Sequence, residues 1–233
     1  MRIGSLFSGI GGLELGLERA IPNATTLWQI ELNPYARRVL AKHWPNARRY
    51  DDIQTTDPNE LPPVDLICGG FPCQDISRQN PSKAGVSGRK SGLWAHYVRF
   101  IRGLRPRFVV VENVANLRTR GLGTVLGDLA ACGYDAIWDC IPAAAVGAPH
   151  FRDRLFIIAY PNVQRRKEQR VTISTQAGFP RIERSMPWPP EPAICRVANG
   201  IPHRVDRLRC LGNAVVPQVA EHIGRIVHKL NQQ

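Results

Sequence analysis

The chain has 233 residues, of which 43% are hydrophobic and 21% charged, as in ordinary globular proteins. No apolar run approaches the roughly 20 residues that a membrane-spanning helix needs, which argues against an integral membrane protein. The first residues lead directly into a strand-like segment, without the pattern of a signal peptide. We therefore expect a cytoplasmic protein.

The net charge of +12 is unevenly distributed along the chain. Residues 161–233 carry 12 basic and 5 acidic side chains, whereas residues 1–160 carry 19 basic and 14 acidic ones. Lys and Arg that neutralise phosphates gain affinity through counterion release, so this excess favours a nucleic-acid partner. A solvated basic surface without a partner is the alternative.

Strand and helix signals alternate along the first 160 residues. Strands are expected at residues 2–7, 26–30, 64–68, 108–111, 134–138 and 155–159. Helices are expected at residues 12–21, 34–43, 94–104 and 122–131, with Asn33 capping the second. This alternation predicts an α/β fold with a mostly parallel, doubly wound sheet whose ligand binds outside the carboxyl ends of the strands.

Two segments depart from the alternation. Residues 74–92 contain three glycines and several basic residues with little apolar content, which predicts a long mobile loop of the kind that is usually functional. Residues 161–202 are rich in proline and arginine and predict a small separate module or an ordered excursion from the domain. Residues 218–230 close the chain with an amphipathic helix.

The cysteines indicate one candidate nucleophile rather than a disulfide framework. The six cysteines show no C-x-x-C spacing, so neither a structural zinc site nor a set of disulfides is expected. They are Cys68, Cys73, Cys132, Cys140, Cys195 and Cys210. Cys73 follows a buried strand, two glycines and a proline, where a thiolate nucleophile could lie exposed to substrate. Cys68, inside that strand, reads as a small buried hydrophobe.

A glycine-rich turn, F-S-G-I-G-G, joins the first strand to the first helix. Its glycines allow close approach of a ligand, and the helix N-terminus offers free N–H groups. Glu14 stands where the dinucleotide fingerprint has its third glycine, so the turn does not match that motif. Glu31 ends the second strand, where a carboxylate can accept hydrogen bonds from a ribose.

Three charged residues lie near the ends of two further buried strands. Glu112 follows a run of valines, so burial should raise its pKa and let it share a proton near neutral pH. Arg152 and Arg154 flank Asp153 in an extended segment, and we expect their side chains to point to opposite faces. One could reach a substrate while the other pairs with a phosphate or carboxylate.

Eight segments, in their order along the chain, resemble the successive motifs of the DNA (cytosine-5)-methyltransferase family. They are F-S-G-I-G-G, I-E-L-N-P-Y-A, D-D-I, G-G-F-P-C-Q, S-G-L-W, V-E-N-V, H-F-R-D-R and G-N-A-V-V-P. The resemblance covers residues 1–160 and about 199–230. It implies a Rossmann-like methyltransferase fold that uses S-adenosyl-L-methionine to methylate double-stranded DNA.

The resemblance implies a covalent mechanism at C5 of cytosine. Cys73 would attack C6, Glu112 would hydrogen-bond N3, and Arg154 would hold the pyrimidine ring with Arg152 beside it. C5 would then take the methyl group, lose its proton, and Cys73 would be eliminated. Because the target atom is unreachable inside a duplex, the base would have to flip out.

The resemblance also implies binding residues. Those expected at the cofactor are Phe7, Ser8, Gly9, Gly11, Gly12, Glu31, Leu32, Asp52, Ile53, Gly70, Pro72, Leu93, Asn213, Ala214 and Val215. Phe7 would pack on the cofactor, Glu31 would hold its ribose, and Asp52 and Ile53 would frame its adenine. Those expected at DNA are Gln74, Ser77, Gln79, Arg89, Arg165, Arg166 and Lys167.

The chain departs from the family pattern in two places. His150 stands where the family usually has glutamine, and only about 50 residues fill the place of a much longer target-recognition domain. We therefore expect a short form: a catalytic and cofactor-binding domain at 1–160, a small recognition module at 161–203, and a C-terminal segment at 204–233 that packs back on the first. A monomer encoded by a bacterium or phage is expected, with a restriction endonuclease as a partner in the same cell.

Alternative functions remain at this point. The short recognition region leaves room for an RNA substrate, since some relatives with these motifs methylate tRNA. A non-catalytic DNA-binding relative is a second alternative, against which the intact Cys73, Glu112 and both arginines argue. An adenine methyltransferase is disfavoured, because the L-P-P-V at residues 61–64 neither matches the usual motif nor follows a strand.

Overall fold

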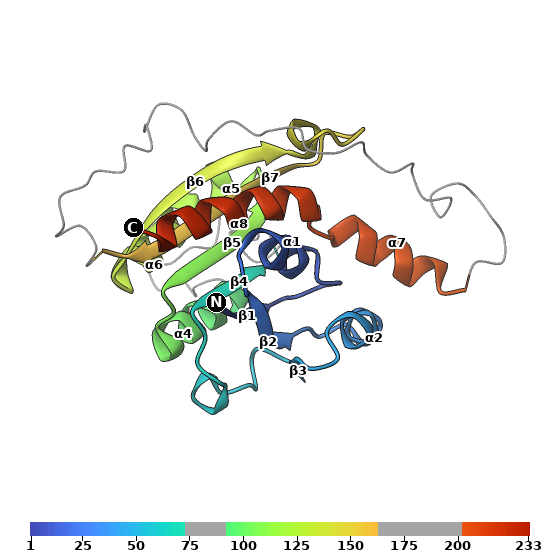
Figure 1. Cartoon of the computed structure of the whole chain (residues 1–233), viewed down its shortest axis with the longest axis horizontal. Coiled ribbons are helices and arrows are strands. Elements are labelled where there is room, and N and C mark those ends of the chain that lie inside the picture. The colour runs from blue at the N-terminus through green and yellow to red at the C-terminus, as the bar shows by residue number, and fades with distance from the viewer. Residues whose placement is uncertain (73–91, 163–201) are drawn as a thin grey trace, which may run out of the picture.

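A seven-stranded sheet forms the centre of the computed structural model, which describes residues 1–72, 92–162 and 202–233. Its order is β3-β2-β1-β4-β5-β7-β6 (Figure 1). The strands are β1 (Arg2–Leu6), β2 (Thr25–Ile30), β3 (Arg48–Tyr50), β4 (Leu66–Gly70), β5 (Phe108–Val114), β6 (Tyr134–Pro142) and β7 (Asp153–Pro161). The first five pair in parallel, and β7 runs antiparallel to both β5 and β6. The mostly parallel, doubly wound sheet is therefore confirmed.

Helices cover both faces of this sheet. They are α1 (Gly12–Ala20), α2 (Pro34–His43), α4 (Gly92–Leu104), α5 (Leu117–Arg120), α6 (Leu122–Ala131), α7 (Arg204–Asn213) and α8 (Pro217–Asn231), with short 3-10 turns η1 (Pro58–Glu60) and η3 (Ala143–Val146). One apolar cluster joins the sheet to α4 and α6, and a second joins its other face to α1 and α8. None of the helices in the described ranges is both long enough and apolar enough to cross a membrane.

The sequence located most elements but not all of their ends. The helices at 34–43 and 122–131 are found as predicted, and Asn33 caps the former by accepting from the backbone N–H groups of Tyr35 and Ala36. The short strand β3 and the helix α7 were missed. The loop expected at 74–92 and the module expected at 161–203 lie almost wholly outside the described residues.

Strand β5 is three residues longer than the prediction of 108–111. Its last residues pair with β7, Val114 opposite Arg154 and Asn113 opposite Leu155. Glu112 therefore lies within the strand rather than after it. Pairing with the antiparallel strand β7 extends β5, and the periodicity of the sequence does not reveal such a neighbour.

Strand order reverses between β1 and β4. This reversal places the turn between β1 and α1 beside the carboxyl ends of β4 and β5. An open α/β sheet binds its ligand at such a point. Helix α8 packs against α1, as Figure 1 shows, and brings the segment that precedes it to the same edge of the sheet.

Candidate active site

The turn between β1 and α1 bends through three residues with positive φ. Phe7 has φ 55°, Gly9 φ 56° and Gly11 φ 86°, a conformation that glycine adopts without strain and phenylalanine only at a cost. The backbone N–H of Gly9 donates to Glu31 Oε2 at 2.7 Å, and that of Asn33 donates to Glu31 Oε1 at 2.8 Å. Glu31 thus fixes the turn against the start of α2.

Gly12 begins α1 in a position that no side chain could occupy. A Cβ at this residue would lie 2.2 Å from the backbone oxygen of Val215. The connection between α7 and α8 therefore lies directly on the glycine-rich turn, although about 200 residues separate the two in the sequence.

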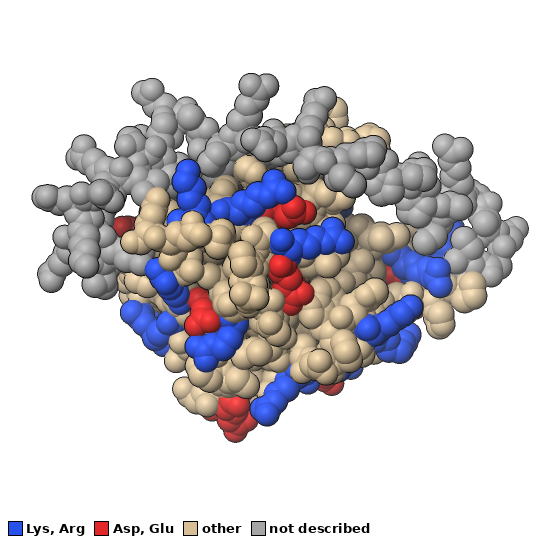
Figure 2. Space-filling view, in the orientation of Figure 1, with Lys and Arg blue, Asp and Glu red and all other residues tan. Residues whose placement is uncertain are grey.

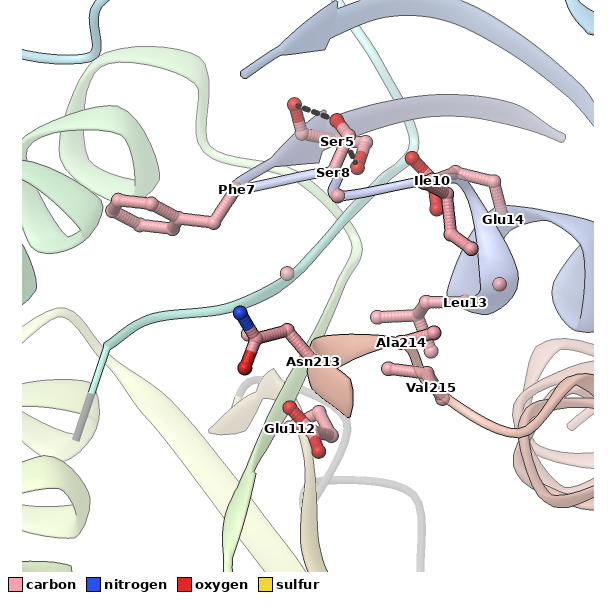
Figure 3. A pocket seen from close by; sticks show the side chains of 14 residues that line it. Ser5, Phe7, Ser8, Ile10, Leu13, Glu14, Glu112, Asn213, Ala214 and Val215 are labelled. Atoms are coloured by element: carbon pink, nitrogen blue, oxygen red, sulfur yellow. Dashed lines mark hydrogen bonds between the residues drawn. The ribbon is translucent and has the colours of Figure 1, made fainter. Parts of the chain in front are cut away.

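A pocket lies at the carboxyl ends of β1, β4 and β5 (Figure 3). Its lining residues are Ser5, Phe7, Ser8, Gly9, Ile10, Gly12, Leu13, Glu14, Gly69, Gly70, Glu112, Asn213, Ala214 and Val215. Figure 3 shows Asn213, Ala214 and Val215 along one side of it, with Glu112 and Glu14 at separate places on its wall. It combines a glycine-lined cradle, apolar side chains and two carboxyl groups.

Glu112 faces this pocket from β5. Burial raises its pKa to about 7, while the positive charges of Arg154 and Arg152 oppose that rise. Arg154 Nε lies 3.1 Å from Glu112 Oε1. The register explains the pair: Arg154 lies opposite Val114, two residues beyond Glu112, so both side chains stand on one face of the sheet as diagonal neighbours. The expectation of a raised pKa is confirmed.

The expectation that the two arginines point to opposite faces was wrong, since both act on Glu112; strict alternation itself places residues two apart on one face. Arg152 precedes β7 and has φ 28°, so the strand's alternation does not reach it. Its guanidinium donates to the backbone oxygen of Ala214, at the rim of the pocket. Burial, and then repulsion by Arg154, hold its pKa below the usual value for arginine. Both arginines therefore lie within electrostatic reach of Glu112.

The backbone that leads to Cys73 is held from the neighbouring strand. Buried Asn113 donates from Nδ2 to the backbone oxygen of Phe71 at 2.9 Å. A Cβ on Gly70 would lie 2.5 Å from Glu112 Oε2, so a side chain at this position would displace that carboxyl group. The described part of the chain stops at Pro72 and resumes at Gly92. Cys73 itself, like Gln74, Ser77, Gln79, Arg89, Arg165, Arg166 and Lys167, lies outside the described residues.

The pocket brings together many, but not all, of the residues expected at a cofactor. Lining it are Phe7, Ser8, Gly9, Gly12, Gly70, Asn213, Ala214 and Val215. Gly11 does not line it, because its position faces the ring of Trp44. Ile53 is buried in the core, and Asp52 accepts from the backbone N–H of Gln54 at 2.9 Å. Four more of the expected residues do not line the pocket. Glu31 reaches the lining only through its hydrogen bond with Gly9, Leu32 and Pro72 are exposed, and Leu93 is half-buried.

Five lining residues were not expected from the sequence: Ser5, Ile10, Leu13, Glu14 and Gly69. Glu14 is the most unusual of them, since its side chain is fully buried. No clear signal for it is present in the sequence, because an acid in the first turn of a helix is common.

Comparison with known proteins supports the resemblance seen in the motifs. The family described as C-5 cytosine-specific DNA methylase matches residues 1–187. The type II methyltransferase M2.BsuMI of Bacillus subtilis is 36% identical over 68% of this chain and 42% of its own length. M.NgoFVII of Neisseria gonorrhoeae, also a type II methyltransferase, is 33% identical over 67% of this chain and 43% of its own. The chain thus spans less than half the length of either relative.

The fold has solved counterparts. The S. pombe Dnmt2 methyltransferase superposes with a TM-score of 0.58, covering 70% of this chain and 51% of that structure, at 22% sequence identity. At this identity the likeness concerns the fold alone. It agrees with the Rossmann-like architecture predicted from the order of strands and helices.

Proposed function

The chain belongs to the C-5 cytosine-specific DNA methylase family, and on that premise we propose that it methylates C5 of cytosine in double-stranded DNA. The observation that carries the proposal is the pair formed by Glu112 and Arg154 beside the glycine-lined pocket. This arrangement provides an acid that holds a proton near neutral pH and a cation that fixes it in place. Glu112 stands opposite Gly70, next to the backbone that leads to Cys73.

The family implies S-adenosyl-L-methionine as the methyl donor, and the pocket fits such a ligand. Gly9 leaves open space beside the turn, Gly12 lets the turn pack closely on Val215, and Phe7 adds an apolar wall. Glu31 presents a carboxylate beside Gly9 that can accept further hydrogen bonds from a ribose. When bound, the cofactor supplies a methyl group on an electrophilic sulfonium.

We assign Cys73 the role of the nucleophile, on the strength of its place in the P-C-Q motif. Its thiolate would form a bond to C6 of a flipped-out cytosine, because C5 is a poor nucleophile while the ring is aromatic. The electron pair displaced from the C5–C6 double bond moves toward N3, where Glu112 delivers or shares its proton. After C5 has received the methyl group, its proton passes to solvent water and the C6–S bond breaks, which restores the C5–C6 double bond and the Cys73 thiolate. N3 then returns its proton to Glu112.

Arg154 has two tasks in this scheme. Its positive charge opposes the effect of burial on Glu112, so the carboxyl group can exchange a proton rather than remain permanently neutral. Its free N–H groups can also donate to the pyrimidine ring. Arg152 supports the site from outside by tying the start of β7 to the backbone at Ala214.

The charges expected to bind DNA are concentrated in two segments. Residues 73–91 carry four basic and one acidic side chain, and residues 163–201 carry seven basic and three acidic ones. On the face in Figure 2, Lys and Arg of the described residues instead lie interspersed with Asp and Glu. We propose that these two segments contact phosphates and that the second, being short, reads a site of about two to four base pairs.

The names of the relatives suggest the biological setting. Type II methyltransferases act in restriction and modification, so a restriction endonuclease that cuts the unmethylated form of the same site is the proposed partner in the cell. We also propose that the chain acts as a monomer.

Methyl transfer from isotope-labelled S-adenosylmethionine tests the proposal. The protein is incubated with double-stranded DNA or with tRNA, and a C73S variant serves as the matched control. Labelled 5-methylcytosine in DNA, absent with C73S, is the expected result, and bisulfite sequencing then gives the target site. Label found only in tRNA would show that RNA, and not DNA, is the substrate. No transfer to either nucleic acid would overturn the proposed activity.

A further inference from the structure

The wall of the pocket contains a second acid that the proposed mechanism does not use. Glu14, in the first turn of α1, is 0% exposed, and neither of its carboxyl oxygens has a hydrogen-bond partner of regular geometry. It lines the same pocket as Glu112 (Figure 3). An ionised carboxylate buried without a partner is costly, so such a group in a folded protein calls for an explanation.

The groups around Glu14 do not supply a compensating cation. The hydroxyl groups of Ser5 and Ser8 approach its carboxyl and favour ionisation, but they bond mainly to each other, at 2.8 Å between their oxygens. Cys68 on β4 and Gln29 on β2 flank Ser5 in register on the sheet beneath. Both are uncharged at neutral pH: glutamine does not ionise, and burial raises the pKa of the Cys68 thiol.

The charged groups of the adjoining elements are engaged elsewhere. Glu18, one turn along α1, opposes ionisation of Glu14 and itself accepts from Thr26 and Trp44. On α8, which packs against α1, Arg225 pairs with Glu221, and burial lowers the pKa of His222. On β5, across the pocket, Arg154 pairs with Glu112. No salt bridge within the described parts of the chain involves Glu14.

The missing cation can come with the ligand. S-adenosylmethionine carries a positive sulfonium and an ammonium group against one carboxylate, so it brings a net positive charge into the pocket. We propose that Glu14, which is buried in the wall of the pocket, supplies the counter-charge to the cofactor. Its ionised carboxylate stabilises the positive charge of the bound ligand, so Glu14 acts as a positioning residue. The inference rests on the proposed use of this cofactor.

The proposal predicts that cofactor binding and ionisation of Glu14 are linked. With the pocket empty, burial holds the pKa of Glu14 at about 7, and a nearby cation must lower it. Binding then releases a proton, and affinity rises with pH until Glu14 is ionised in both states. A decrease of one pKa unit, from about 7 to about 6, corresponds to about a fivefold increase in affinity between pH 6 and pH 8.

Isothermal titration calorimetry tests this linkage without measuring catalysis. S-adenosylmethionine and S-adenosylhomocysteine, which lacks the sulfonium charge, are titrated at pH 6 and pH 8 into the wild-type chain and into E14Q. Glutamine keeps the size and hydrogen bonding of the side chain but cannot ionise. In the wild type, the affinity for the charged ligand should rise about fivefold more than that for the neutral one between pH 6 and pH 8. In E14Q this difference should vanish.

The E112Q variant separates the two acids of the pocket. It removes the other group that titrates near neutral pH and should retain the difference between the ligands. At pH 7, E112Q should also release about 0.4 proton more with S-adenosylmethionine than with S-adenosylhomocysteine. This measurement leaves Glu14 unaltered, so it still tests the proposal if E14Q does not fold. Equal proton release by both ligands, or an E14Q profile that parallels the wild type, would overturn the inference. A wild-type chain that binds neither ligand would instead refute the proposed cofactor.

Discussion

Arg154 Nε lies 3.1 Å from Glu112 Oε1, and this pair joins the antiparallel strand β7 to the buried carboxyl group of β5. The two effects on Glu112 are opposed: burial raises its pKa, and the neighbouring guanidinium groups lower it. The outcome, a pKa of about 7, lies where a group can both hold and give up a proton at neutral pH. Four predictions for the described residues follow, and a fifth concerns Cys73.

Replacing Glu112 by glutamine should separate chemistry from cofactor binding. Glutamine retains hydrogen bonding but cannot deliver a proton, so the single-turnover rate of methyl transfer should fall by about 100-fold or more. The affinity for S-adenosylmethionine should change little. The matched variant is E31Q, at the carboxylate that anchors the glycine-rich turn, which should weaken cofactor binding more than it slows the bound complex. The reverse pattern in the two variants would mean that their roles are exchanged.

Removing the charge of Arg154 should raise the pKa of Glu112 above about 7, because burial would then act with less opposition. The change is R154Q, and the measurement is a titration of Glu112 followed by NMR of 13C-labelled carboxyl groups. R225Q, which removes an arginine that pairs with Glu221 on the exposed side of α8, should leave that pKa unchanged. An unaltered pKa in R154Q would show that Arg154 has little electrostatic influence on Glu112.

Adding a single methyl group at Gly12 should damage the pocket. The new Cβ would lie 2.2 Å from the backbone oxygen of Val215, so the connection between α7 and α8 would have to move. We expect G12A to lose more than about tenfold in cofactor affinity. G123A in α6 is the matched control, since its Cβ meets nothing within 4 Å; higher helix propensity should stabilise that variant by about 0.5–1 kcal/mol. Normal cofactor affinity in G12A would contradict the close approach.

Glu14 should make the stability of the empty protein dependent on pH. Its pKa is about 7 in the folded chain against 4.5 for the free side chain, so its stabilising contribution is complete below 4.5 and is lost as the pH rises through about 7. Glutamine does not titrate. E14Q should therefore gain stability relative to the wild type between pH 4 and pH 8, by up to about 3 kcal/mol in urea unfolding. A constant difference between the two proteins would show that Glu14 does not titrate in this range.

The fold could be predicted from the sequence because its signals are local. Apolar strands and amphipathic helices alternate along residues 1–160, and Asn33 followed by Pro34 marks the start of α2 unambiguously. Strand β3 was missed because three residues, two of them arginines, carry no apolar alternation. The arginine-rich helix α7 was missed for a related reason: it has a single buried side chain, Cys210, and hence no apolar stripe.

Only those residues of the site that lie in recognisable sequence motifs could be predicted. Glu112 and the glycine-rich turn were found because their residue types, close to the carboxyl ends of apolar strand segments, point to chemistry. The position of Arg152 depends on a positive φ before β7, which the sequence does not reveal. The burial of Glu14 depends on how α1 lies over β1 and α8, and such contacts between distant segments are not encoded in any local pattern.

The most direct test of the proposed mechanism is covalent trapping on double-stranded DNA that contains 5-fluorocytosine. Fluorine at C5 cannot leave as a proton does, so once Cys73 has attacked C6 and the methyl group has been transferred, the C6–S bond should persist. The account predicts a protein–DNA adduct that depends on S-adenosylmethionine and is stable to denaturation, with mass spectrometry locating the bond at Cys73 and none forming in C73S. Efficient methylation of ordinary DNA without any such adduct, or an adduct at another cysteine, would contradict it.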